Sequence, residues 1–281
     1  MNTNQFGTLY IVATPLGNLQ DMSFRAVSIL KDVDRIASED TRHSLPLLRH
    51  FSIQKPLISL HEHNERTRAT SLLEFLKNGE SIALISDAGT PLISDPGAHL
   101  VQMVREAGIQ VVPIPGPCAA IAALSASGLP TDRFVFEGFL PVKGKVRRDR
   151  LDALKNETRT IIFYEAPHRI ADLLEDMETT FGKDRECVLA RELTKIYETI
   201  HAAPLTELQK WIKEDRYRER GEIVLLVKGI LEFSYENHVA NEEILKILLD
   251  DLPLKQAIEL TAKITGQKKN EVYGRALVLK K

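Results

Sequence analysis

The residues Ser81–Gly97 read SIALISDAGTPLISDPG. Their first part, Ser81–Ser86, is a short apolar run, which predicts a buried β-strand. Their second part is a loop in which the pattern Ser-Asp-x-Gly occurs twice, beginning at Ser86 and again at Ser94. Glycine lets backbone amides approach a ligand closely, and proline fixes a loop without any side chain reaching in. The segment therefore predicts a ligand-binding loop at the end of a strand.

A helix is predicted directly after this loop. Its apolar stripe consists of Leu100, Val101 and Val104, and Asp95 can cap its start with Pro96 at the first helical position. A strand, a loop and a helix in this order are typical of sheets whose strands alternate with helices. In such sheets, ligands bind outside the carboxyl ends of the strands.

Apolar, β-branched runs on both sides of this segment predict further strands. In the first part of the chain they are Leu9–Ala13, Val33–Ala37, Leu57–Ser59 and Gln110–Ile114. A helical stripe between them consists of Ala69, Leu72, Leu73 and Leu76. This alternation predicts a mostly parallel sheet covered by helices.

The pattern changes after Pro130 and again at Asn241. Strands are predicted at Arg133–Phe139, Arg159–Tyr164, Cys187–Ala190 and Glu222–Val227. A helix between them has its stripe at Ile170, Leu173, Leu174 and Met177, and three short helices follow Asn241. We therefore expect an α/β domain over residues 1–115, a second α/β domain with a mixed sheet over 116–231, and a small helical module over 236–281.

Length, composition and charge exclude several classes of protein. A chain of 281 residues with 43% hydrophobic and 27% charged residues is neither disordered nor fibrous. Its 37 Lys and Arg against 39 Asp and Glu give a net charge of −2, which excludes a uniformly basic polyanion binder. Two cysteines, Cys118 and Cys187, are too few for a disulfide framework, and neither a signal peptide nor a membrane span is recognisable. We expect a cytoplasmic protein with no membrane partner.

Small residues and prolines also follow two other strands, at Ala13–Asn18 and at Pro115–Cys118, and the latter leads into the run Ala119–Gly128. Ordinary turns would account for any one of these loops. Three of them at equivalent ends of one sheet favour a ligand cleft. The chain has no G-x-G-x-x-G, and Gly138–Lys145 lacks the glycine spacing of a phosphate loop, so P-loop hydrolysis and dinucleotide binding are unsupported.

Two polar clusters follow strands in the second half, at Tyr164–Arg169 and Arg191–Lys195. Such residues beside apolar strands are either paired with one another or functional, and a structural ion-pair network remains open for the second cluster. His168 can equally well mark a helix start. His61 and His63 can share one face of a strand as metal ligands, but no third ligand is identifiable by spacing, so we expect no metal site.

Eight motifs, in order along the chain, resemble the tetrapyrrole-methylase-like, class III S-adenosylmethionine-dependent methyltransferases, and among them a branch that methylates ribosomal RNA. The motifs are VATPLGNL (Val12–Leu19), ASEDTR (Ala37–Arg42), HEHNE (His61–Glu65), SDAGTPLISDPG (Ser86–Gly97), PGPCA (Pro115–Ala119), FYEAPHR (Phe163–Arg169), ARELTK (Ala190–Lys195) and GEIVLLV (Gly221–Val227). Each motif alone is weak, but the ordered set is highly specific.

The resemblance implies two α/β domains with S-adenosylmethionine in the cleft between them, and a homodimer. It implies methyl transfer to the ribose 2′-hydroxyl of a cytidine in the decoding region of 16S ribosomal RNA, within the small ribosomal subunit. It also implies cofactor contacts, largely through backbone atoms, at Pro15, Leu16, Asp87, Ala88, Gly89, Thr90, Ile93, Ser94, Leu124, Ser125, Tyr164, Leu193 and Glu222.

Methyl transfer to a hydroxyl depends mostly on alignment of the acceptor oxygen, the methyl group and the sulfur atom. A ribose hydroxyl is a weak nucleophile, so a positioned base or a cation would assist. The polar residues of the motifs that can take these roles are Glu39, Asp40, Arg42, His61, Glu165, His168, Arg169, Glu192 and Lys195.

RNA binding needs positive surface. Five cations lie close together at a connection that contains Gly144: Lys143, Lys145, Arg147, Arg148 and Arg150. A second group, within 210–220, is diluted by acids and fits a solvated face. From Lys255 to the end, the chain has seven basic and two acidic residues. A turn at Gly266 between two predicted helices resembles a helix-turn-helix. Lys268 and Lys269 are therefore expected to contact RNA.

Three other functions remain open at this point. The same fold and cofactor can serve methylation of a small tetrapyrrole, although such a substrate does not require the basic groups. A metal-dependent hydrolase would use His61 and His63. A non-catalytic RNA-binding scaffold would not bind S-adenosylmethionine.

Overall fold

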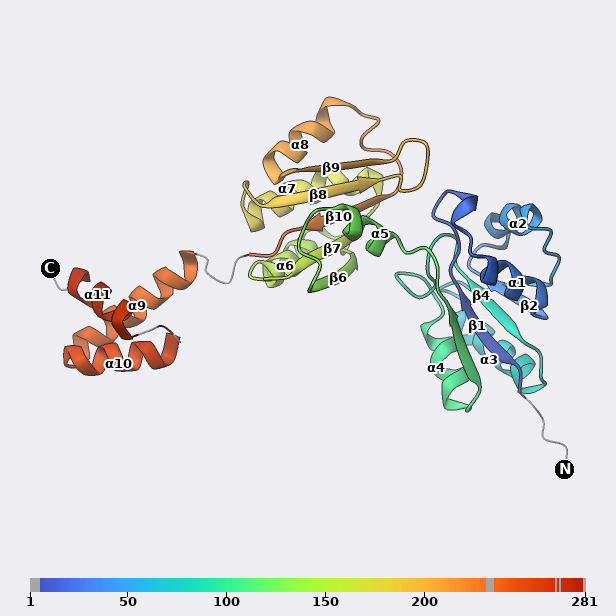
Figure 1. Cartoon of the computed structure of the whole chain (residues 1–281), viewed down its shortest axis with the longest axis horizontal. Coiled ribbons are helices and arrows are strands. Elements are labelled where there is room, and N and C mark those ends of the chain that lie inside the picture. The colour runs from blue at the N-terminus through green and yellow to red at the C-terminus, as the bar shows by residue number, and fades with distance from the viewer. Residues whose placement is uncertain (1–5, 231–234, 266, 268, 280–281) are drawn as a thin grey trace. The chain divides into compact units, whose positions relative to one another are not determined.

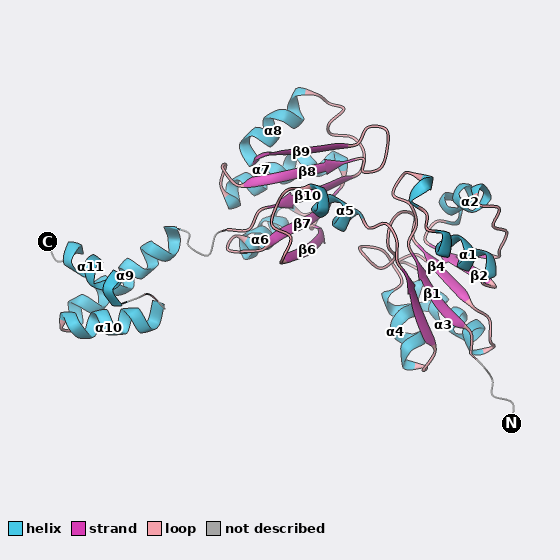
Figure 2. Ribbon diagram, viewed as in Figure 1, coloured by secondary structure: helices cyan, strands magenta, loops and turns pink. Residues whose placement is uncertain are grey.

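The computed structural model describes residues 6–230, 235–265, 267 and 269–279. The chain divides into two compact units, Met1–Lys228 and Gly229–Lys281. The first unit contains two five-stranded sheets, and the described part of the second contains three helices (Figures 1 and 2). The predicted α/β class with a terminal helical module is confirmed. The predicted boundary between residues 115 and 116 falls within the first unit, after the last strand of the first sheet, and stays a prediction.

The first sheet consists of five parallel strands. In spatial order they are β3 (Leu57–Ser59), β2 (Arg35–Ser38), β4 (Ile82–Ile85), β1 (Thr8–Val12) and β5 (Gln110–Ile114). All five were predicted within two residues. Val12, the last residue of β1, pairs with Ile85 of β4 and Ile114 of β5. The loops after these three strands therefore leave the sheet at one edge.

Helices cover both faces of this sheet. One face packs against α3 (Glu65–Lys77) and α4 (Ala98–Glu106), and the other against α1 (Phe24–Asp32) and α2 (Thr41–His50). A short 3-10 turn, η1 (Leu19–Asp21), precedes α1. Neither α1 nor α2 was predicted from the sequence, and Pro46 inside α2 argues against a helix on local grounds.

The start of α4 differs from the prediction. The helix begins at Ala98 with Gly97 as its N-cap, so Asp95 does not cap it and Pro96 lies before it. The free amides at its start are instead bound by Glu65 of α3, whose Oε1 accepts hydrogen bonds from Gly97 at 3.1 Å, His99 at 2.9 Å and Leu100 at 3.4 Å. A carboxylate is a strong cap because it also interacts favourably with the helix dipole.

The second sheet is mixed, as predicted. Its order is β6 (Phe134–Phe139), β7 (Thr160–Glu165), β10 (Ile223–Val227), β8 (Glu186–Arg191) and β9 (Thr199–Pro204). Only the pair of β6 and β7 is parallel. The strand β9 was not predicted, because it is a partly exposed edge strand without a continuous apolar run.

Three helices cover one face of the second sheet: α6 (Gly144–Leu154), α7 (Ile170–Phe181) and α8 (Leu205–Glu214). The turn η2 (Pro167–Arg169) leads into α7. The opposite face packs against α5 (Ala119–Ala126) together with Leu16 and Leu193. The small-residue run Ala119–Gly128, to which no secondary structure was assigned from the sequence, is thus largely a helix, since alanine is the strongest helix former.

The second unit consists of α9 (Tyr235–Asp251), α10 (Leu254–Thr265) and α11 (Lys269–Leu279). Its core contains Leu245, Ile258 and Val272, one from each helix. No helix within the described ranges is long and apolar enough to span a bilayer.

Candidate active site

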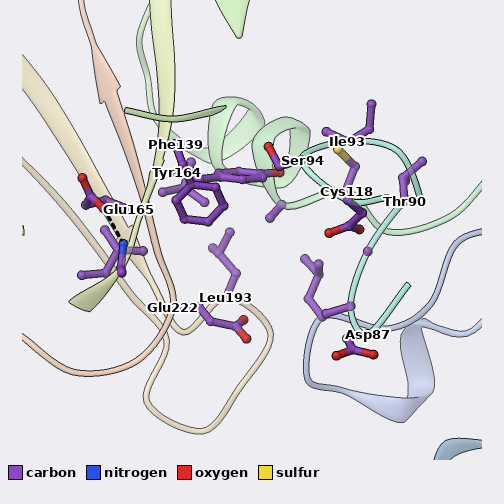
Figure 3. A pocket seen from close by; sticks show the side chains of 18 of the residues that line it. Asp87, Thr90, Ile93, Ser94, Cys118, Phe139, Tyr164, Glu165, Leu193 and Glu222 are labelled. Carbon is purple, nitrogen blue, oxygen red and sulfur yellow. Dashed lines mark hydrogen bonds between the residues drawn. The ribbon is translucent and has the colours of Figure 1, made fainter. Parts of the chain in front are cut away.

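A cavity of about 330 Å³ lies among the loops at the carboxyl edge of the first sheet and the strands of the second (Figure 3). This volume lies within the usual range of small-molecule sites. Residues of both α/β domains line this interdomain cavity, namely Leu16, Asp87, Ala88, Gly89, Thr90, Ile93, Ser94, Asp95, Cys118, Ala119, Phe139, Tyr164, Glu165, Ala166, Pro167, Leu193, Glu222, Ile223 and Val224.

The loops after β1, β4 and β5 are joined by hydrogen bonds. Thr14 and Gly89 exchange backbone bonds of 2.8 and 3.0 Å, and the Thr14 hydroxyl donates to the carbonyl of Ser86 at 3.2 Å. The Thr90 hydroxyl donates to the carbonyl of Pro117 at 2.8 Å. One wall of the cavity is therefore preformed, which lowers the entropic cost of ligand binding.

The backbone of the loop after β4 is strained. Leu92 and Ser94 have positive φ angles of 73° and 69°, which cost side-chain-bearing residues free energy. Gly138 of β6, itself at φ 65°, comes so close that a Cβ atom there would lie 2.9 Å from the Ser94 hydroxyl. Strained residues held by close packing are concentrated at ligand sites.

Aromatic rings form the wall on the side of the second domain. The Tyr164 ring lies edge-on to Phe136 at 5.0 Å and to Phe139 at 5.6 Å between centroids. Its hydroxyl accepts a hydrogen bond of 3.0 Å from the amide of Ala120. Burial, and next the neighbouring Cys118, raise the pKa of Tyr164, so it remains neutral. Figure 3 shows Phe139 and Tyr164 side by side, across the cavity from Thr90. The rings offer an apolar surface to a flat ligand group.

The charge of the interdomain cavity is one-sided. Asp87, Asp95, Glu165 and Glu222 line it, whereas no lysine, arginine or histidine does so among the residues that the structure describes. Burial raises the pKa of Asp95 to about 6, and the charge of nearby Glu39 adds to this effect. The cavity thus favours a cationic ligand and disfavours a phosphate.

Glu165 is a buried carboxyl at the end of β7. Its Oε1 accepts a bond of 2.8 Å from the Ala166 amide and lies 3.1 Å from Nε of Arg169. Its Oε2 has no hydrogen-bond partner within the described part of the chain. Burial raises the pKa of Glu165. Arg169 also donates to the carbonyl of Leu140 at 2.7 Å, so it stabilises the local structure.

An ion-pair network joins the loop after β8 to the start of β10. Lys195 Nζ lies 3.0 Å from Oε1 of Glu192 and 3.1 Å from Oε2 of Glu222. Glu192 Oε1 also accepts a bond of 2.9 Å from the Glu222 amide. Burial by itself raises the pKa of Glu192, but the Glu222 amide and Lys195 outweigh it and hold that pKa below its usual value. The alternative of a structural network for this cluster therefore has a physical basis.

Most of the residues implied as cofactor contacts lie together. Ten of the thirteen line the interdomain cavity: Leu16, Asp87, Ala88, Gly89, Thr90, Ile93, Ser94, Tyr164, Leu193 and Glu222. Pro15, Leu124 and Ser125 do not. The helix α5 turns Leu124 into the core and leaves Ser125 exposed, with its hydroxyl on the carbonyl of Ala122.

The residues considered for catalysis are more scattered. Only Glu165 lines the cavity, and Glu192 and Lys195 reach it through Glu222. Asp40 caps α2 and pairs with Arg42 at 2.8 Å. The Arg42 side chain is 88% exposed, and His168 is exposed outside the cavity lining.

The two histidines do not lie on a strand, so they do not share the strand face that the sequence had left open. His61 and His63 follow β3 in a turn, with their ring centroids 6.0 Å apart. Nε2 of His61 lies 3.0 Å from the side-chain nitrogen Nδ2 of Asn64. Across the described residues, no group of three or more histidine, cysteine, aspartate or glutamate side chains is placed to hold a metal ion. A hydrolase with a metal held by these histidines has no structural support.

Several lining residues were missed. Cys118, Ala119, Ala166 and Pro167 belong to quoted motifs and were within reach of the sequence. Asp95 was assigned to helix capping, because Asp-Pro before an apolar stripe is a typical helix start. Ile223 and Val224 also belong to a quoted motif, whereas Phe139 lies outside all eight motifs.

The basic segment 143–150 lies mostly on α6 and is not a connection. Arg147 is buried, with its Nε 2.7 Å from Asp176, which argues against the RNA contact that we expected there. Arg148 also pairs with Asp176 at 3.4 Å, and Arg150 pairs with Glu137 at 2.7 Å.

Lys143 and Lys145 are exposed. Their contact with RNA stays a prediction. In the second unit, Lys269 pairs with Glu259 at 2.7 Å, and Lys268 lies outside the described residues.

One α/β domain has a parallel sheet, the other has a mixed sheet, and together they enclose an acidic cavity. This arrangement is that of the tetrapyrrole methylases. The model of the Tetrapyrrole (Corrin/Porphyrin) Methylases matches residues 8–209, and that of the RsmI C-terminal HTH domain matches residues 239–280. Among solved structures, diphthine synthase has a TM-score of 0.59 at 15% identity, over 81% of this chain and 92% of that one. Uroporphyrin-III-C-methyltransferase from Thermus thermophilus has a TM-score of 0.57 at 18% identity, over 79% and 94%. These two show the fold.

Relatives of higher identity define the family. The "Ribosomal RNA small subunit methyltransferase I" of Pseudomonas aeruginosa is 55% identical over 273 residues, which cover 96% of this chain and 97% of that protein. The protein of the same name from Escherichia coli O157:H7 is 56% identical over 282 residues, covering 98% and 96%. The chain belongs to this family of methyltransferases within the tetrapyrrole methylases. Its methyl donor is S-adenosylmethionine.

Proposed function

We propose that the protein transfers the methyl group of S-adenosylmethionine to the ribose 2′-hydroxyl of a cytidine in the decoding region of 16S ribosomal RNA. The name shared by its relatives supports RNA of the small ribosomal subunit as the substrate. The observation that carries the methyl-transfer chemistry is the interdomain cavity with four carboxylic acids and, among its described lining, no basic side chain. S-adenosylmethionine is a sulfonium cation and supplies an electrophilic methyl group.

The chain offers three kinds of contact to this cofactor. The strained loop after β4 lines the cavity at Asp87, Gly89 and Ser94. The rings of Phe139 and Tyr164 provide a surface for the flat adenine base. The carboxylates attract the cationic part, and the unpartnered Oε2 of Glu165 would accept a donor group of the ligand. The residues present therefore fit the cofactor.

Alignment of the acceptor is the main catalytic requirement, and a nearby carboxylate or cation adds to it. Because Glu165 lines the cavity and Lys195 is bound to Glu222 at its edge, these residues come first among the candidates. Lys195→Met is expected to lower kcat with little change in cofactor affinity, whereas Glu165→Gln is expected to lower kcat and also to weaken cofactor binding, because the Glu165 carboxylate lines the cofactor cavity. His168→Ala is the comparison, since His168 is exposed outside the cavity lining. Equal transfer rates in all three variants would remove Glu165 and Lys195 as candidates.

The decisive experiment supplies labelled S-adenosylmethionine with unmodified 16S RNA, either free or within small ribosomal subunits. The expected result is a single 2′-O-methylated cytidine in the decoding region. Label on a base, or on an added tetrapyrrole in place of RNA, would contradict the proposal. Calorimetric titration with S-adenosylmethionine distinguishes the methyltransferase from a non-catalytic scaffold, because the scaffold would not bind the cofactor.

We also propose that the protein works as a homodimer in the cytoplasm and binds the small subunit through its helical module. Large exposed apolar side chains such as Phe24, at 96% exposure, support a contact between copies. Sedimentation would test the dimer. Truncation after Lys228 would test the module: subunit binding is expected to weaken, and unchanged binding would contradict its role.

A further inference from the structure

A second, wider cavity of about 870 Å³ lies within the first unit. Three segments line it: Gly17–Gln20 after β1, His50 and Phe51 at the end of α2, and Thr194–Tyr197 between β8 and β9. We call it the acceptor groove. No role follows for it from the family assignment or from the interdomain cavity.

The acceptor groove shares a wall with the interdomain cavity. Leu16 and Leu193 line the interdomain cavity, and the next residues of the chain, Gly17 and Thr194, line the groove. The side chain of Lys195 also lines the groove, and its Nζ ends on Glu222, which lines the interdomain cavity. A Cβ atom on Gly17 would lie 2.8 Å from Cε of Lys195, so the lysine passes close over the glycine. A molecule in the groove would lie directly beside the site of methyl transfer.

The chemistry of the groove is opposite to that of the interdomain cavity. Within the described ranges, no aspartate or glutamate lines the groove. Its polar side chains include those of Asn18, Gln20 and His50, and Lys195 lines it with a side chain whose Nζ is paired with Glu192 and Glu222. Amides read the edges of unpaired bases. The set of groups fits a nucleotide with an exposed base.

Tyr197 is displayed at the rim on a fixed loop. Its side chain is 73% exposed, while its carbonyl accepts a bond of 3.1 Å from Arg191. Thr194 has a positive φ of 66°, and its amide donates to Glu198 at 2.6 Å. The backbone is thus held while the ring remains free. A rigid exposed tyrosine is a typical platform on which single-stranded bases stack.

We propose that the acceptor groove binds an unpaired nucleotide next to the one that is methylated, with its base on the Tyr197 ring. This inference rests on the proposed function, because that function makes RNA the acceptor. Paired RNA does not fit, since its bases are stacked on each other and unavailable to an aromatic ring.

The test compares Tyr197→Ala, Tyr197→Phe and Tyr217→Ala in the full-length protein. Tyr217 is a matched control, because it is 64% exposed on a loop that does not line the groove. The probe is unmodified 16S RNA, with binding followed by fluorescence anisotropy and with KM measured in the transfer assay. Tyr197→Ala should raise the Kd and the KM for RNA about tenfold, whereas the other two variants stay within about twofold of the native protein. The Kd for S-adenosylmethionine should be the same in all.

Unchanged RNA affinity in Tyr197→Ala would overturn the inference. So would a lower molecular mass of this variant in sedimentation, because Tyr197 would then belong to a contact between copies of the chain. If RNA binding depends on Tyr197 but the native protein transfers no methyl group, nucleotide binding in the groove is supported and the proposed function is refuted. If the native protein transfers the methyl group but RNA affinity is the same in Tyr197→Ala, the proposed function is supported and nucleotide binding in the groove is refuted.

Discussion

The carboxylate of Glu65 accepts a hydrogen bond from the backbone amide of His99, with 2.9 Å between Oε1 and N. The two residues lie on different helices, α3 and α4, and the same oxygen accepts the amide of Gly97 at 3.1 Å. Because Glu65 caps α4, Asp95 is not needed at the helix start and instead lines the interdomain cavity. The contact between these helices thus supplies the cap that Asp95 would otherwise provide, and Asp95 is one of the four carboxyls of the cavity.

Replacement of Glu65 by alanine is expected to destabilise the protein by about 1 kcal/mol, since it removes the cap of α4. It should also weaken binding of S-adenosylmethionine, because the loop 94–97 loses its anchor. Urea unfolding and calorimetric titration measure the two effects. Glu62→Ala is the control, as Glu62 is exposed in the same segment. Equal stability of the two variants would contradict the capping role.

Replacement of Asp95 by asparagine is expected to change how stability depends on pH. The pKa of Asp95 is raised from 3.8 to about 6 in the folded protein, mainly by burial. The folded state therefore binds the proton more tightly than the unfolded state, and the native protein loses stability as pH rises from about 4 to about 6. Asp95→Asn removes this loss. The difference in free energy of unfolding between the variant and the native protein should therefore be larger above pH 6 than below pH 4, in favour of the variant, by on the order of 1 kcal/mol after allowance for solvent screening. Parallel pH profiles in urea unfolding would refute this prediction.

Replacement of Gly138 by alanine tests the close approach between β6 and the loop after β4. A Cβ atom there would lie 2.9 Å from the Ser94 hydroxyl, at a φ of 65° that is itself unfavourable. Gly108→Ala is a matched control, because Gly108 has a φ of 71° and open space around it. We expect a loss of about 1 kcal/mol for Gly108→Ala and a larger loss for Gly138→Ala, with weaker cofactor binding only in the latter. Adding Ser94→Ala should recover part of the difference.

The parts of the fold that the sequence predicted are those encoded in local runs. Strands such as Ile82–Ile85 are buried, so their apolar residues are continuous and visible in the sequence. The edge strand β9 and the helix α2 lack this signal, because one is half exposed and the other contains Pro46. In the same way, the alanine-rich α5 has no polar face from which a helical period can be recognised.

The site was predictable where small residues mark a loop, as at Gly89 and Pro117. It was not predictable where two distant side chains compete for one role. The sequence around Asp95 has the form of a helix cap, and only the folded chain brings Glu65 close enough to take that role. Arg147 likewise belongs to a basic segment by sequence, but Asp176, on another helix, holds it inside the protein.

The basic segment of α6 therefore separates into a structural and a binding part. The side chains of Arg147 and Asp176 are only 8% and 13% exposed, so Arg147→Ala leaves a carboxylate poorly solvated and should cost about 3 kcal/mol of stability. Lys145→Ala, at an exposed position, should leave stability within about 0.5 kcal/mol but weaken RNA binding and lower its salt dependence by roughly one counterion. Chemical unfolding and anisotropy titrations over a range of salt concentrations would measure both variants. Since Arg147 is paired inside the protein, a loss of RNA affinity in Arg147→Ala without loss of stability would contradict this division.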